Sequence, residues 1–142
     1  MKNMMIRTTQ VLVLTILAVA SAQAQQQKVE IGGAGSSGIH PAKVTAGSKA
    51  NAAVVLSVTG SDGKAITGEA SNLTAVTFVV PGGAPCGMNP TGVAEVKPGI
   101  YRMTLSMPAL PQCVWAEGDY LAVARIGTVN YAGMAPFVVT VR

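Results

Sequence analysis

The sequence has little of what most enzymes need at an active site. Its single histidine, His40, lies beside Pro41 in a glycine-rich stretch. Nucleophilic catalysis needs a rigidly held base with an orienting partner, so a solvated His40 is the better interpretation. The pair Gly82 and Gly83 lacks the lysine and the following helix of a phosphate-binding loop. These absences predict a chain that is not an enzyme and has no cofactor.

Charge is scarce as well, since charged residues make up 11% of the chain. Glu117 and Asp119 lie two positions apart, but acid–base catalysis needs two carboxylates held in a cleft with different proton affinities. A solvated turn before a strand explains this pair better. The lysines and arginines are scattered along the chain, whereas nucleic-acid binding requires a basic stripe or patch. We therefore expect no nucleic-acid partner.

The N-terminus has the pattern of a cleaved secretory signal. Lys2 and Arg7 precede an apolar run over residues 11–20, and an Ala-Gln-Ala sequence ends at Ala24. A membrane span needs about 20 apolar residues, roughly twice this run, so a cleaved signal is favoured over an anchor. We expect a periplasmic or extracellular protein that contacts a membrane only during export. The predicted organisation is a signal peptide, a flexible Gly/Ser-rich leader and one domain, over residues 1–24, 25–41 and 42–142.

Helical periodicity is absent, and apolar residues alternate with polar ones instead. The clearest case is residues 100–107, where Tyr101, Met103 and Leu105 alternate with polar side chains. Alternation with many β-branched residues is typical of half-buried strands, and turns rich in glycine, proline and aspartate separate the segments. The predicted strands are residues 42–46, 52–58, 74–80, 93–96, 100–107, 119–126 and 136–141.

About seven short strands predict an all-β fold, which we expect to be an antiparallel two-sheet immunoglobulin-like sandwich. Successive connections in such a sandwich alternate between its two ends, so Cys86 and Cys113 fall in two loops at the same end. An even number of cysteines in an exported chain argues for a disulfide. Metal binding by two thiols would need further ligands at close spacing. The sequence predicts a Cys86–Cys113 disulfide that joins two loops.

Residues 54–68 carry a strand followed by an Asp-x-Gly turn at Asp62 and Gly63. This stretch resembles the opening of bacterial immunoglobulin-like domains of the adhesin and invasin type. Pro98 to Tyr101 and Gly118 to Tyr120 are similar to the starts of two later strands of that family. The resemblance implies a non-enzymatic cell-surface or secreted domain, with no catalytic residues to transfer.

A partner-binding surface is predicted from side chains that should point outward. On strands 52–58 and 100–107 the outward residues are largely polar, whereas on strands 74–80, 119–126 and 136–141 they are largely apolar. In strand 74–80 this assignment points Thr77 and Val79 outward and Val76 and Phe78 inward. Contiguous exposed apolar patches mark interaction sites, although single exposed valines are common and the leader could cover them. Trp115 is a second candidate because tryptophan often anchors a partner; alternatively it caps the core against the disulfide. The predicted contact residues are Val79, Leu121, Val123, Val138 and Trp115, for a protein or cell-surface partner.

Copper binding is the alternative function. Thioether ligands suit Cu(I), and the chain after residue 24 has Met88, Met103, Met107 and Met134 besides His40. Met103 and Met107 should face inward, where they fill the core. Met88 and Met134 are expected in loops at opposite ends, so the sequence favours a domain without a metal site.

Overall fold

The computed structural model describes residues 25–33 and 43–142, which form seven strands and two single 3₁₀ turns. None of the helical segments in this part of the chain is long and apolar enough to cross a membrane. The predicted signal peptide lies outside the described residues. The strands are β1 (Gln27–Gly33), β2 (Ala52–Gly60), β3 (Leu73–Val79), β4 (Asn89–Lys97), β5 (Ile100–Ser106), β6 (Gly118–Gly127) and β7 (Tyr131–Val141), with η1 (Ala70–Asn72) and η2 (Pro81–Gly83).

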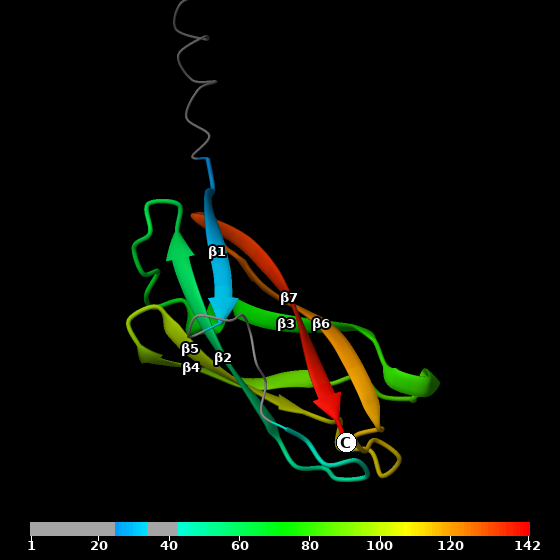
Figure 1. Ribbon diagram of the computed structural model, residues 1–142. Coiled ribbons are helices and arrows are strands. Elements are labelled where there is room, and N and C mark those ends of the chain that lie inside the picture. The colour runs from blue at the N-terminus through cyan, green and yellow to red at the C-terminus, as the bar shows by residue number, and fades with distance from the viewer. Residues whose placement is uncertain (1–24, 34–42) are drawn as a thin grey trace, which may run out of the picture.

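The seven strands form one mixed sheet in the order β3-β6-β7-β1-β2-β5-β4. The all-β prediction is confirmed, but the expectation of two separate antiparallel sheets is wrong. β1 is the reason, because it pairs antiparallel with β2 and parallel with β7. It lies between these two strands and joins two groups of strands that would otherwise be separate layers (Figure 1). The mixed sheet curls strongly into a half-barrel.

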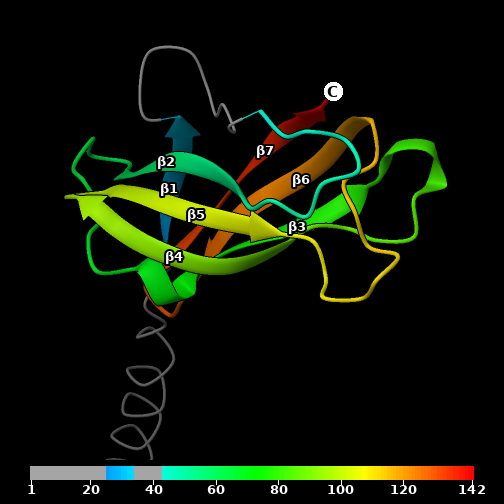
Figure 2. The same cartoon turned by 90° about the horizontal axis from the view of Figure 1, so that it is seen from below.

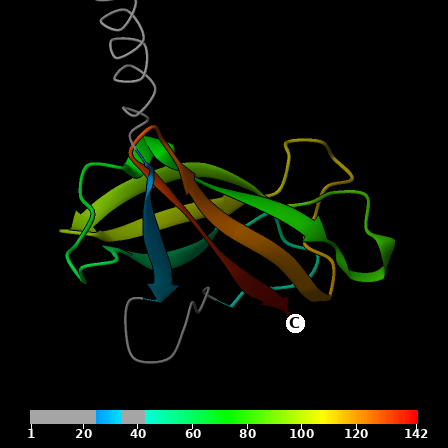
Figure 3. The same ribbon diagram turned by 90° about the horizontal axis from the view of Figure 1, so that it is seen from above.

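The core lies inside this curl. Figures 2 and 3 show β2, β5 and β4 facing β7, β6 and β3 across the molecule. Alternate residues of β2 and β5 are buried against alternate residues of β6 and β7, which is the pattern of a sheet with one solvated face. A single hydrophobic cluster results, and its fully buried large side chains include Leu56, Val58, Tyr101, Met103, Leu105, Trp115, Tyr120 and Val139.

Six of the predicted strands are present, but the first is displaced. The predicted strand at 42–46 contains a single bridge between Val44 and Val141. The true first strand is β1, inside the segment predicted to be a flexible leader; residues 34–41 of that segment lie outside the described residues. Val29 and Ile31 of β1 are buried. Pairing on both sides of β1 outweighs the cost that Gly32 and Gly33 impose on a strand.

Before its bulge, β3 has its two faces reversed relative to the prediction. Leu73 and Ala75 are buried, whereas Val76 and Phe78 are exposed. The sequence had placed Val76 and Phe78 in the core. The register with β6 shifts between Thr77 and Val79, which marks a bulge at Phe78. A bulge adds one residue to a strand, so strict alternation fails along this strand.

Candidate functional site

The most unusual surface of the molecule is an apolar area on the outside of β3, β6 and β7, here called the outer face. Cross-strand pairs place its side chains next to one another on the same side of the sheet: Val76 with Val123, Val79 with Leu121, Leu121 with Val138, and Val123 with Pro136. Phe78, at the bulge, is 58% exposed and belongs to the same area. The outer face therefore consists of Val76, Phe78, Val79, Leu121, Val123, Pro136 and Val138.

Four of the predicted contact residues lie together on the outer face. Val79 and Val138 are exposed, whereas Leu121 and Val123 are half-buried between neighbouring side chains. Sequence reasoning missed Val76 and Phe78 because it assumed unbroken alternation in β3. Thr77 gave no signal of the error, because a polar residue on the outer side is what unbroken alternation predicts.

Polar groups border the outer face at both ends. At one end Arg125 pairs with Met134, and both side chains are exposed. At the other end the Thr140 hydroxyl donates a 2.8 Å hydrogen bond to Asp119. The sequence predicted Asp119 in a solvated turn before a strand, whereas it lies in β6 and makes this cross-strand contact. An apolar centre with a polar rim is the composition of a protein-interaction surface.

The outside of the other half of the sheet is more polar. Val55 of β2 is exposed but pairs with Arg102, and its neighbour Ala53 pairs with Thr104. Val96 is also exposed, next to Lys97 near the end of β4. Charged and hydroxyl side chains thus separate the apolar ones, so this half has no counterpart of the outer face.

Trp115 is fully buried, which removes it from the predicted contact residues. Its indole N–H donates a 2.8 Å hydrogen bond to the Ala50 carbonyl. Its ring meets Tyr120 edge to face, with centroids 5.1 Å apart. The alternative interpretation, that Trp115 closes the core beside the disulfide end, agrees with this burial.

The predicted disulfide between Cys86 and Cys113 is present, with Cα atoms 5.4 Å apart. It joins the β3–β4 connection to the β5–β6 connection, and both lie at the same end of the molecule (Figure 2). This placement was predicted from alternating connections, and it holds although the sheet is continuous. The bond also indicates an oxidising compartment, where such bridges persist.

A groove of about 360 Å³ lies beside this disulfide. One wall is the edge of β3, at Ala75, Val76 and Thr77, and the Thr77 hydroxyl donates a 2.8 Å hydrogen bond to the Met88 carbonyl. The opposite walls come from the disulfide-linked loops. Its lining residues are Ala75, Val76, Thr77, Pro85, Cys86, Gly87, Met88, Asn89, Pro108, Leu110 and Cys113, none of which is charged.

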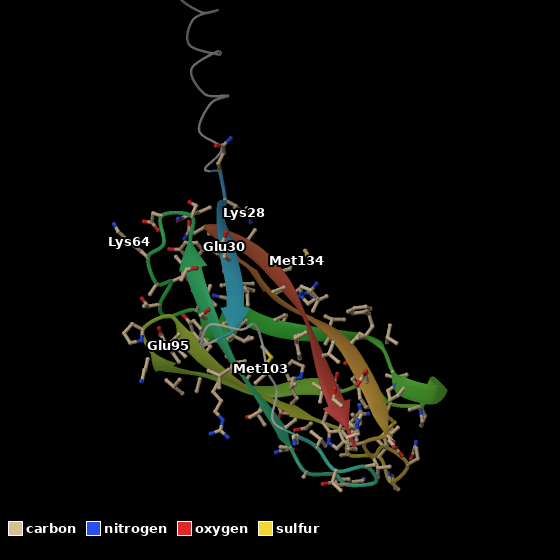
Figure 4. All side chains as sticks on the ribbon, in the orientation of Figure 1. Lys28, Glu30, Lys64, Glu95, Met103 and Met134 are labelled. Carbon is tan, nitrogen blue, oxygen red and sulfur yellow. A yellow bond between two sulfur atoms is a disulfide. The ribbon has the colours of Figure 1, made fainter. Side chains whose placement is uncertain are left out.

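Of the four methionines in the described residues, three are buried. Met88, Met103 and Met107 are buried in the core. Met134 lies on β7 and not in a loop, and it is 74% exposed. Figure 4 shows Met103 within the curl of the sheet and Met134 on the outside of β7. His40 lies outside the described residues, and among those described no three His, Cys, Asp or Glu side chains cluster as ligands.

The one carboxylate with a distinctive environment is Glu95, which lies near the turn between β4 and β5 (Figure 4). It accepts hydrogen bonds from the Gly68 N–H at 2.9 Å and the Gly99 N–H at 2.8 Å. These two bonds, the Gly68 bond first, hold the pKa of Glu95 below its ordinary value. Nearby, the Tyr101 hydroxyl donates to the Ile66 carbonyl at 2.6 Å, and burial raises the pKa of this tyrosine. Both residues hold the loop at 66–69 against the sheet, a structural task.

No protein-family model, curated protein or solved structure matches this chain.

Proposed function

We propose that this chain is an exported, non-enzymatic binding domain whose outer face contacts a protein or cell-surface partner. The observation that carries the proposal is the continuity of the apolar side chains across β3, β6 and β7. Val76, Phe78, Val79 and Val138 are each at least 40% exposed. Burying such side chains against a partner removes apolar area from water at about 25 cal/mol per Å², which favours association.

One feature of the sequence and one of the structure support export. The N-terminal pattern of basic residues, an apolar run and Ala24 is typical of a secretory signal. The disulfide is stable where the surroundings are oxidising. The resemblance of residues 54–68 to bacterial immunoglobulin-like domains supports a binding role, since those domains occur in adhesins and surface proteins.

A photocrosslinking amino acid at position 138 tests the proposal in the cells that make the protein. Position 55 is a matched control, because Val138 and Val55 are 40% and 37% exposed on opposite halves of the sheet. We expect a discrete crosslinked species from position 138 and none from position 55. We also expect Val138→Ser, but not Val55→Ser, to weaken the complex with the partner so identified. Equal crosslinking from both positions, or none from either, would refute a partner on the outer face.

A further inference from the structure

The two edges of the sheet differ in how well they are protected. The curled sheet does not close, so β3 and β4 each leave one side without a neighbouring strand. β4 contains Pro90, Glu95 and Lys97 and has two register shifts. Proline, charges and bulges are the devices that prevent an edge strand from pairing with another chain. β3, with the sequence LTAVTFV, has neither proline nor charge, and one register shift near its end.

On the side away from β6, the backbone of β3 forms no hydrogen bond with another strand of the sheet. Among the described residues, backbone hydrogen bonds of Leu73–Val79 are confined to the ladder with β6. The side-chain bond from Thr77 to Met88 leaves these backbone groups unused. A strand edge of this kind can accept an additional strand through its N–H and C=O groups.

The groove beside the disulfide follows this same edge. Ala75 and Thr77 face the core side of the sheet and Val76 faces the outer side, yet all three line the groove. It therefore runs along the strand edge and is not confined to one face. Gly87 and Met88 lie against the Thr77 side chain, and Leu110, which is exposed, also lines the groove. Walls on both sides suit one extended chain better than the edge of a second folded copy.

The lining defines the chemistry of the occupant. Because no lining residue is charged, a charged side chain buried there would have no partner and would cost several kcal/mol. Small and apolar walls instead accept apolar or hydroxyl side chains at alternate positions of a bound strand, while the backbone of β3 supplies its hydrogen bonds.

We propose that the groove along the edge of β3 binds an extended, uncharged segment of a partner protein as an additional strand of the sheet. The proposal rests on the proposed binding function and names the class of partner. The outer face continues from β3 onto β6, so a strand added at the edge would extend that face and leave it exposed.

The test uses the purified protein and two displayed peptide libraries. Both contain nine-residue peptides built from Val, Ile, Thr, Ser, Ala and Phe, and the second has proline at its central position. We expect binders from the first library and none from the second, because proline removes a backbone donor and disrupts strand pairing. A selected peptide should slow amide hydrogen exchange in β3 and leave exchange in β4 unchanged.

Lysine variants locate the site. Val76→Lys places a charge at the edge of β3 and should weaken the selected peptide about tenfold or more. Ala94→Lys does the same on the exposed edge strand β4, and Val138→Lys does so on the outer face away from the edge. Both controls should bind the peptide as the unchanged protein does. Circular dichroism verifies that all three variants are folded.

Several outcomes would overturn the proposal: equal enrichment from both libraries, no enrichment from either, or binding that Val76→Lys leaves intact. A dimer in sedimentation that Val76→Lys dissociates would identify a second copy as the occupant and would also overturn it. The outer-face proposal is judged separately. If a partner crosslinks at position 138 but no peptide binds, the outer-face proposal stands and the groove proposal is refuted. If a peptide binds the groove but nothing crosslinks at position 138, the groove proposal stands and the outer-face proposal is refuted.

Discussion

Trp115 and Tyr120 meet edge to face inside the molecule, and both side chains are fully buried. Their contact fixes the turn that leads from the disulfide into β6. The Tyr120 hydroxyl accepts a 2.8 Å hydrogen bond from the Ala116 backbone N–H, and the backbone N–H of Trp115 donates at 3.0 Å to the Ser48 carbonyl. The tryptophan thus connects the β5–β6 loop with the segment before β2.

Trp115→Phe should destabilise the protein while leaving partner binding intact. The substitution removes the hydrogen bond to the Ala50 carbonyl and leaves space beside Tyr120. We expect the free energy of unfolding to fall by about 1–3 kcal/mol, measured by urea titration with circular dichroism. Unchanged stability together with lost partner binding would mean that Trp115 acts as a contact residue after all.

Removal of the disulfide should have a larger effect. Cys86 and Cys113 are 27 positions apart, and closing a loop of this size stabilises by about 3.5 kcal/mol in the chain-entropy model. We expect the double variant Cys86→Ala, Cys113→Ala to lose about 2–4 kcal/mol of unfolding free energy in urea titration. Reduction of the unchanged protein with dithiothreitol should give a similar loss. Equal stability of the oxidised and reduced forms would contradict a stabilising bridge.

Gly133→Ala tests the joint that makes the sheet continuous. A Cβ at position 133 would lie 2.7 Å from Val29 Cγ2 and closer still to the Val29 carbonyl oxygen. Because β1 and β7 must move apart, we expect a loss of about 1–3 kcal/mol and faster hydrogen exchange in β1. Gly127→Ala is the matched control, since no atom lies within 4 Å of its added Cβ. Unchanged exchange in β1 would contradict this close approach.

Glu95 should make stability depend on acid pH. Its folded-state pKa is lowered from the ordinary value of 4.5 by the Gly68 N–H and then the Gly99 N–H. Between the lowered pKa and 4.5 the unfolded chain binds more protons, so stability increases with pH there. The contribution is complete above 4.5 and is lost as the pH falls through the folded-state pKa.

Glu95→Gln should therefore lower stability at pH 7 and flatten its decline at acid pH. The measurement is a series of urea titrations from pH 7 downward. Glu117→Gln, which changes an exposed carboxylate in a turn, controls for net charge and should keep the full decline. Identical pH profiles for Glu95→Gln and the unchanged protein would refute the role of these hydrogen bonds.

Where alternation was strict, the sequence predicted the strands well. β5 is the clearest case, because Tyr101, Met103 and Leu105 are fully buried and occupy one face. β3 shows the limit: the bulge near Phe78 changes which residues face the core, and a bulge depends on pairing with a neighbouring strand. This is why Val76 and Phe78 of the outer face were misassigned.

The sequence by itself determined the all-β class, six of the strands and the pairing of Cys86 with Cys113. These follow from local alternation, turn residues and the order of connections, which act over short distances along the chain. Tertiary structure alone decided that Gln27–Gly33 is a strand, that it joins the sheet into one, and that Trp115 is buried. Each of these depends on contacts between distant residues, whose free energy outweighs the preferences of the local sequence.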